Sequence, residues 1–168
     1  MDGSTMEPHA PATASKGGLH TPRTPRTVLT FGTFDLFHLG HLRILERSAA
    51  LGDRLLVGVS TDALNFSKKG RFPFVPEEDR MAIIAALRCV DGVFREESLE
   101  KKRDYLVQHK ADVLVMGHDW KGRFDEFRDV CEVVYLPRTD SVSTTEIESL
   151  IRNRPSPRHQ VRQGDRPA

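Results

Sequence analysis

Two histidines, His38 and His41, stand at the start of a segment with a helical apolar pattern. The preceding residues 28–31 are suited to a short buried strand, Gly32 allows the chain to turn, and residues 39–51 carry apolar side chains at helical spacing. A spacing of three lets both imidazoles point to one side of the first helical turn. Because a helix begins with free N–H groups and the positive end of its dipole, this pattern favours a phosphate site with two additional donors.

Two other interpretations of these histidines stay open. Two histidines with one glycine between them are also common as ordinary surface residues. Zinc-binding helices place two histidines four residues apart with a glutamate between them, whereas here the spacing is three and Leu39 and Gly40 intervene. The sequence therefore disfavours a metal site, and we assign no metal ligands.

A second candidate phosphate site lies near the end of the chain, where residues 131–136 predict a strand and residues 144–152 a helix. Ser143 and Glu146 have the spacing of a capping box. A well-capped helix would explain those two residues, but it would not explain Arg138 or three consecutive hydroxyl side chains. Two helix beginnings with polar donors on one sheet would suit a polyphosphate such as a nucleoside triphosphate.

A basic stretch at residues 65–71 holds Lys68, Lys69 and Arg71 beside a glycine, and we expect it to form a loop. Such a loop can close over phosphates, although a basic loop is more often simply solvated. Arg80 and Arg88, eight residues apart on the next predicted helix, can share a face or be plain surface residues.

The composition predicts one globular domain. The 168 residues are 38% hydrophobic and 29% charged, with a formal net charge of +1, which gives no reason to expect nucleic acid. No apolar run approaches the length of a membrane span and no secretory signal is apparent, so we expect a cytoplasmic protein without a membrane partner. Cys89 and Cys131 lie in apolar stretches and are expected to be reduced, buried thiols.

Alternating elements predict the fold. Residues 1–26 and the basic residues 154–168 have the composition of disordered tails, which leaves a domain at 27–153. Strands are expected at 28–31, 54–60, 92–95, 112–116 and 131–136, with helices at 40–51, 77–88, 99–109 and 144–152 and a short helix before the last strand. This series predicts an α/β, Rossmann-like, doubly wound parallel sheet of five strands, in which ligands bind beyond the carboxyl ends of the strands.

Over residues 28–151 the chain resembles the cytidylyltransferase family, and within it the glycerol-3-phosphate cytidylyltransferases. The resemblance covers several motifs in one order: Gly32-Thr33-Phe34-Asp35, His38-Leu39-Gly40-His41, Leu51-Gly52-Asp53, Ser60-Thr61-Asp62, Val115-Met116-Gly117 with Asp119-Trp120, Cys131 to Thr139, and Ser143-Thr144-Thr145.

The resemblance implies a role for each matching position. His38, His41, Lys68 and Arg138 would be catalytic, and Lys68 and Lys102 would meet the phosphate of the acceptor. Contacts to CTP, or support for them, are implied for Thr33, Phe34, Asp35, His38, Leu39, Gly40, His41, Lys69, Arg80, Arg88, Asp119, Arg138, Thr139, Asp140, Ser141, Val142, Ser143, Thr144 and Thr145. The family also implies Mg²⁺ and a homodimer.

The chain departs from the family pattern at three places. Thr139-Asp140-Ser141-Val142 stands where Thr-Glu-Gly-Ile is more usual, His118 replaces an acidic residue, and the lysine loop is one residue longer, so Lys69 or Arg71 could replace the second lysine.

The implied reaction joins CTP and glycerol 3-phosphate to give CDP-glycerol and pyrophosphate. A phosphate monoester is largely dianionic at neutral pH, so its oxygen needs no general base, and positioning and charge stabilisation would supply the catalysis. Two alternatives remain. One is a related transferase acting on phosphoethanolamine, a polyol phosphate or a phosphonate, or using ATP with a sugar phosphate; the other is a nucleotide-binding module without turnover.

Overall fold

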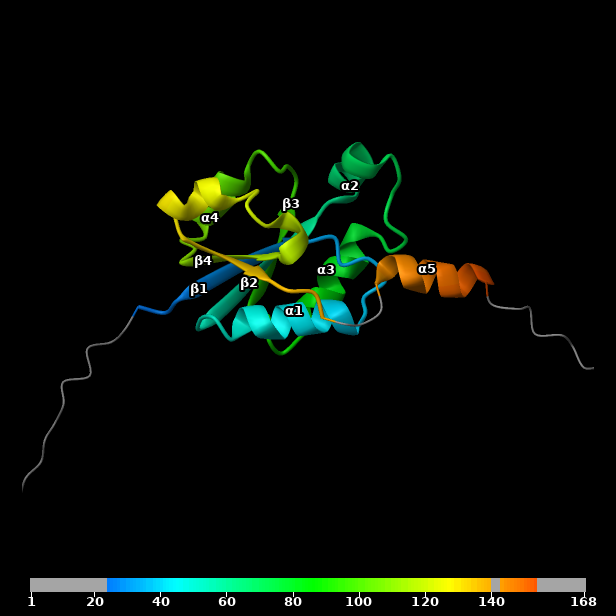
Figure 1. Ribbon diagram of the computed structural model, residues 1–168, viewed down its shortest axis with the longest axis horizontal. Helices are drawn as coiled ribbons and strands as arrows, with labels where there is room; N and C mark the ends of the chain where they lie inside the picture. The colour runs from blue at the N-terminus through cyan, green and yellow to red at the C-terminus, as the bar shows by residue number, and fades with distance from the viewer. Residues whose placement is uncertain (1–23, 140–142, 154–168) are drawn as a thin grey trace, which may run out of the picture.

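The computed structural model describes residues 24–139 and 143–153, which form a parallel sheet covered by helices on both faces (Figure 1). The strands are β1 (Thr27–Gly32), β2 (Arg54–Ser60), β3 (Gly92–Glu96), β4 (Val113–Gly117) and β5 (Glu132–Leu136). The helices are α1 (Leu39–Ala49), α2 (Asp62–Lys69), α3 (Glu77–Ala85), α4 (Lys102–Gln108) and α5 (Thr144–Asn153), with short 3₁₀ helices η1 (His118–Trp120) and η2 (Asp125–Asp129).

The sheet has the strand order β3-β2-β1-β4-β5, and all four strand pairs are parallel. The chain builds outward from β1 to β3 on one side and then crosses to β4 and β5 on the other. The order therefore reverses between β1 and β4, and the crevice beyond their carboxyl ends is where such a sheet binds ligands. This confirms the predicted five-stranded, doubly wound fold.

Two apolar layers sandwich the sheet. Leu45 of α1 and Ile84 of α3 pack with Val57 and Val113 on one face, while Leu106 of α4 and Phe127 of η2 join the core on the other. Figure 1 shows the same division, with α1 and α3 on one side of the strands and α4 on the other, and α5 projecting beyond the sheet. The strand at 54–60 is buried on both faces from Leu55 onward, as predicted for a covered parallel strand.

The basic stretch predicted as a loop is largely helical, so that prediction is wrong for residues 65–69. Thr61 accepts a hydrogen bond from the Leu64 N–H (3.1 Å) and caps α2 at its start, and Gly70, at φ +68°, ends it. Both are ordinary helix start and stop signals. Only Gly70 to Pro76 remain as a loop between α2 and α3.

The helix α1 stops at Ala49, two residues before the predicted end at residue 51, so Gly52 does not directly follow it. A Cβ at Gly52 would lie 2.6 Å from the Arg26 carbonyl oxygen, so the glycine permits two segments to cross closely. Arg26, expected in the N-terminal tail, is fixed here, since its N–H donates to Asp53 (2.7 Å). Of the two predicted tails, residues 1–23 and 154–168 lie outside the described residues. Within the described ranges, no helix is both long and apolar enough to cross a membrane.

Candidate functional site

The segment Gly32–His41, called here the histidine turn, connects β1 to α1 in an unusual backbone conformation. Phe34 (φ 53°) and Leu36 (φ 45°) both occupy the left-handed region, which non-glycine residues seldom adopt and which is enriched at functional sites. Gly32 makes the turn possible, because a Cβ there would lie 2.8 Å from the Phe34 ring. The buried Phe34 ring in turn meets His41 edge-on, with 5.4 Å between centroids.

His38 is the N-cap of α1, since its Nδ1 accepts a hydrogen bond from the Gly40 N–H at 3.1 Å. A neutral imidazole that accepts at Nδ1 carries its proton on Nε2, which leaves that N–H as a donor. Burial lowers the pKa of His38, against a smaller opposing effect from the Glu146 carboxylate. His38 therefore enters the site as a neutral donor whose orientation the helix cap holds.

His41 stacks on His38 with ring centroids 3.9 Å apart. Burial and the neighbouring imidazole lower the pKa of His41 to about 4, although Asp35 opposes the shift. Its Nδ1 is buried and has no hydrogen-bond partner in the part of the chain that the structure describes. Unpartnered buried polar atoms are rare and cluster at functional sites. An incoming phosphate would stabilise the imidazolium and raise this pKa.

The start of α5 is bonded directly to the histidine turn. The predicted capping box is confirmed, since Ser143 N–H donates to Glu146 (2.6 Å) and Glu146 N–H to the Ser143 hydroxyl (3.2 Å). The Thr144 hydroxyl donates to the Asp35 carbonyl oxygen at 3.2 Å. The two predicted phosphate elements therefore meet, and His41 and Thr144 line the same cavities.

Two cavities adjoin the histidine turn, and the larger of them, about 380 Å³, opens at the carboxyl ends of β1 and β4. This volume falls in the range of small-molecule sites. Among the residues with expected roles, its walls include Thr33, Phe34, His38, Gly40, His41, Asp119, Arg138, Thr139, Ser143, Thr144 and Thr145. Leu39 is exposed and is not among the lining residues, and Asp140, Ser141 and Val142 lie outside the described residues.

Arg138 lies at the rim of the larger cavity and is strongly exposed. Its Nε and Nη2 both donate to one Asp119 oxygen, at 2.9 and 2.6 Å. Behind it, Arg47 of α1 donates to the Pro137 carbonyl (2.9 Å) and holds the chain that follows β5. Arg138 is thus a solvent-accessible cation available to a phosphate, with Asp119 orienting it.

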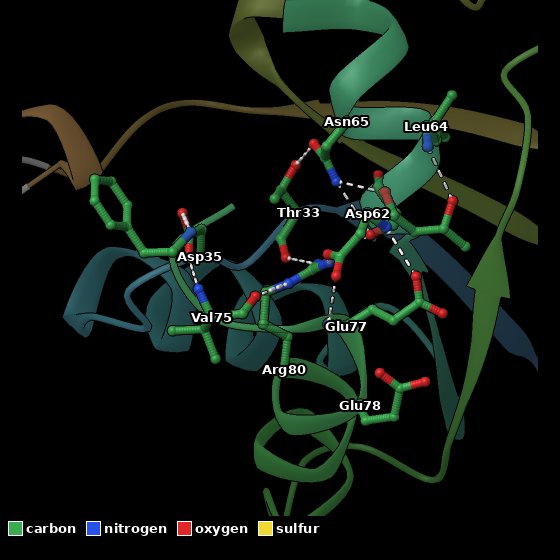
Figure 2. Close-up of polar contacts among 12 residues, drawn as sticks. Thr33, Asp35, Asp62, Leu64, Asn65, Val75, Glu77, Glu78 and Arg80 are labelled. Carbon is green, nitrogen blue, oxygen red and sulfur yellow. Dashed lines mark hydrogen bonds and ion pairs between the residues drawn. The ribbon is translucent and has the colours of Figure 1, made fainter. Parts of the chain in front are cut away.

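Arg80 lines neither cavity, and of the phosphate-facing and supporting roles that the resemblance implied, its contacts fit the supporting one. Figure 2 shows its buried guanidinium enclosed by acceptors. It donates to the carbonyls of Val75 (2.8 Å), Thr33 (2.6 Å) and Ser60 (2.9 Å) and to the Asp62 carboxylate (2.6 Å). This set, the arginine node, supports the histidine turn from behind through the Thr33 carbonyl.

Lys102 is also removed from the cavities, so the structure does not bring it to an acceptor phosphate. Its ammonium group is fully buried, pairs with the equally buried Glu96, and lies 3.5 Å from the centroid of the Phe31 ring. Burial lowers the pKa of Lys102, and the Glu96 carboxylate opposes that shift. A second Glu96 oxygen accepts from the Ser60 hydroxyl (2.6 Å).

The remaining cationic residues with expected roles differ in whether they line a cavity. Lys69 lines the smaller cavity together with Arg71, whereas Lys68 lines neither cavity. Arg88 is exposed, follows the end of α3 and also lines neither.

The carboxylate of Asp35 forms hydrogen bonds within the protein. It accepts from the backbone N–H groups of Leu36, Phe74 and Val75 at 2.9 to 3.0 Å. It therefore joins the histidine turn to the loop after α2.

The described residues do not form a magnesium site of their own. No group of three or more His, Cys, Asp or Glu side chains within them is placed to hold a metal ion. Among the carboxylates that line the cavities, Asp35 accepts from backbone N–H groups and Asp119 from Arg138. Mg²⁺ is commonly held by substrate phosphates and water with few protein ligands.

Sequence reasoning missed three polar residues near the site: Asn65, Glu96 and Glu148. Asn65 accepts from the Thr33 hydroxyl (2.7 Å) while its own amide donates to the carbonyls of Ser60 and Thr61. The sequence signal for Asn65 is its position four residues after Thr61, the N-cap of α2. One helical turn after the cap, its side chain can reach back to the end of the preceding strand. Glu96 and Glu148 carry no comparable local pattern.

Comparisons with known proteins find relatives in sequence and in structure. Residues 29–150 match the family model described as cytidylyltransferase-like. Glycerol-3-phosphate cytidylyltransferase of Bacillus subtilis (strain 168) is 47% identical over 110 residues, covering 66% of this chain and 84% of that protein; the enzyme of Staphylococcus aureus (strain NCTC 8325 / PS 47) is 42% identical over 107 residues, covering 64% and 80%.

A solved structure extends the likeness to three dimensions. The lipopolysaccharide core biosynthesis protein from Thermoplasma volcanium GSS1 superposes with a TM-score of 0.61 at 27% identity, over 70% of this chain and all of that one. The sequence match spans most of the domain and includes both helix beginnings that line the larger cavity. The chain therefore belongs to the cytidylyltransferase-like family.

Proposed function

We propose that this protein is a glycerol-3-phosphate cytidylyltransferase, which transfers CMP from CTP to glycerol 3-phosphate and releases pyrophosphate. The names of its relatives support the reaction, and those relatives are matched over more than two thirds of their length. One structural observation carries the proposal: the beginnings of α1 and α5, joined by the Thr144 to Asp35 hydrogen bond, face one cavity.

In this proposal the acceptor phosphate attacks the α-phosphorus of CTP in line with the departing pyrophosphate. A bond forms between an acceptor oxygen and that phosphorus, the bond to the bridging oxygen breaks, and the electron pair leaves with pyrophosphate. His38 Nε2–H and the imidazole of His41 stabilise the charge that develops on the α-phosphoryl oxygens. The N–H groups at the start of α5 and the guanidinium of Arg138 hold the outer phosphates.

Two chemical features of the site support this assignment. Before the nucleotide binds, both histidines are neutral at pH 7, because the pKa of each is lowered, so neither must lose a proton to admit it, and a neutral imidazole still offers one N–H donor. The acceptor brings its own ionised oxygen, which removes the need for a protein base. Mg²⁺ would enter bound to the triphosphate of CTP.

The test measures pyrophosphate release from each of the four nucleoside triphosphates. Glycerol 3-phosphate is compared with phosphoethanolamine, another polyol phosphate and a phosphonate as acceptors. The proposal expects CTP with glycerol 3-phosphate to give the highest kcat/KM, and CDP-glycerol to appear in equal amount to pyrophosphate. A higher kcat/KM with another pair would reassign the substrates, and tight CTP binding without pyrophosphate would remove the enzyme assignment.

We also propose the homodimer and the cytoplasmic location expected from the sequence and its family resemblance. Sedimentation equilibrium of the full chain checks the first, with twice the mass of 19.0 kDa expected. Cell fractionation checks the second.

A further inference from the structure

The smaller cavity, about 220 Å³, adjoins the larger one at the histidine turn. The two share Thr33, Phe34, His41, Thr144 and Thr145 as walls. In the proposed reaction the α-phosphorus of CTP lies at His41. If the phosphate of the acceptor reaches it from the smaller cavity, the carbon chain of the acceptor lies in that cavity. The inference below rests on the proposed function and concerns the alcohol end of the acceptor.

The walls of this cavity carry both signs of charge. Lys69 is the last residue of α2 and Arg71 lies in the loop that follows, while Asp35 and Glu148 contribute carboxylates. The cations suit the phosphate of the acceptor. The carboxylates would repel that phosphate. Whether either of them can instead bind another part of the acceptor depends on the hydrogen bonds that it already makes.

Asp35 is engaged mainly within the protein, because three backbone N–H groups from two segments bond to its oxygens at 2.9 to 3.0 Å. Glu148 differs. Its side chain is only 11% exposed, yet its contacts with Arg71 are long, at 3.3 to 3.4 Å, and Arg152 lies 3.9 Å away. Since a carboxylate offers about four lone-pair positions, Glu148 can accept further hydrogen bonds from a ligand.

Thr33 presents a second acceptor in the wall of the cavity. The Asn65 amide nitrogen donates to two carbonyls, which fixes the Asn65 oxygen toward the Thr33 hydroxyl at 2.7 Å. Figure 2 shows this chain of contacts. The Thr33 proton is therefore committed to Asn65, and its hydroxyl offers lone pairs to a ligand.

We propose that the smaller cavity selects a hydroxylated acceptor, with Glu148 as the specificity-determining residue that accepts hydrogen bonds from its hydroxyl groups. The pairing of Glu148 with Arg71 carries this assignment. A hydroxyl fits because it donates to Glu148 or Thr33 and accepts from Lys69 or Arg71. An ammonium group donates equally well, but it would meet the two cations and accept nothing from them.

The experiment compares glycerol 3-phosphate with n-propyl phosphate, which has the same carbon chain and phosphate but no hydroxyl group. Glu148→Met is expected to lower kcat/KM for glycerol 3-phosphate by about 10- to 100-fold, the usual range for hydrogen bonds to a charged group. The kcat/KM for n-propyl phosphate and the KM for CTP should change by less than about twofold. If n-propyl phosphate is not turned over, its inhibition constant against glycerol 3-phosphate replaces kcat/KM.

Two further variants make the result specific. Glu148→Gln keeps one acceptor oxygen and should lose less activity than the methionine variant. If Glu148→Met folds poorly, the glutamine variant replaces it in the comparison of the two acceptors. Glu78→Met is the matched control, because Glu78 also pairs with an arginine (Arg95, 3.2 Å) but lines neither cavity. It should leave both acceptors unaffected.

Each outcome bears on one proposal. An equal loss with both acceptors would mean that Glu148 only holds Arg71 and its loop, and an unchanged kcat/KM for glycerol 3-phosphate would mean that it does not face the acceptor; either overturns the assignment of Glu148 alone. A wild-type protein inactive with CTP and glycerol 3-phosphate would overturn the proposed function, and this inference with it.

Discussion

The arginine node and the histidine turn share Thr33 but use their polar groups in opposite ways. In the node, the Arg80 guanidinium is fully buried and its donors reach three carbonyls and one carboxylate. In the turn, His41 keeps a buried nitrogen without a partner among the described residues, and two residues hold left-handed backbone angles. A satisfied polar cluster stabilises the fold, whereas an unsatisfied one beside a cavity remains available to a ligand.

A cation close to a phosphate site need not face the phosphate. Arg80 and Lys102 carry the charge that a triphosphate needs, yet one holds carbonyls and the other pairs with Glu96. Their effect on the site is indirect, through the Thr33 carbonyl and the Phe31 ring. Substitutions in the arginine node should therefore lower mainly the free energy of unfolding, whereas substitutions in the histidine turn should lower mainly kcat.

The largest effect is expected for Arg80→Met, which leaves the buried carbonyls and Asp62 without their donor. Removing one partner of a buried charge pair commonly costs about 3–5 kcal/mol. The free energy of unfolding, from urea denaturation, should fall by that order. Arg95→Met, which removes an exposed arginine paired with Glu77, is the matched control and should leave unfolding nearly unchanged. Similar losses in the two variants would contradict the structural role of the node.

His41→Asn tests the other region. Loss of one donor to a developing oxyanion commonly lowers kcat by about 10² to 10³, and kcat should fall by that factor while urea unfolding changes little. His109→Asn is the control, since the His109 ring packs against Phe94 at a tilt, with centroids 4.3 Å apart, and lines neither cavity. A variant that unfolds easily but keeps its kcat would place His41 among the structural residues instead.

The pH dependence of stability sharpens the same contrast. An unfolded histidine, with a pKa near 6.5, takes up a proton as the pH falls below that value, but His41 in the folded protein stays neutral until about pH 4. The unfolded state then binds more protons, so this contribution is complete above about pH 6.5 and is lost as the pH falls toward 4. The urea midpoint of the wild type should therefore drop more between about pH 7.5 and 5 than that of His41→Asn. Equal drops would show that the pKa of His41 is not lowered.

The sequence predicted the parts of this molecule that follow from local patterns. The strands, the capping box of Ser143 and Glu146 and the histidine turn each have a short-range signal, and the family resemblance extended them to a reaction. The direction of a long side chain has no such local signal, because whether the side chain is buried depends on residues far away in the sequence. Lys102 is sealed by Glu96 and Phe31, and Glu148 acquires its place only when the loop after α2 reaches α5.

The smallest effects are expected at the rim of the larger cavity, where Arg138 is exposed and held by Asp119. Arg138→Gln should raise the KM for CTP by about tenfold, because a charge-assisted hydrogen bond to phosphate is lost, and should leave unfolding unchanged. Asp119→Asn keeps the cation but weakens its orientation, so the KM should rise only severalfold. Steady-state kinetics at low and high salt checks both, since the contribution of an exposed cation weakens with screening. A larger effect from Asp119→Asn than from Arg138→Gln would mean that Asp119 itself contacts the nucleotide, and the rim would then resemble the histidine turn more than the arginine node.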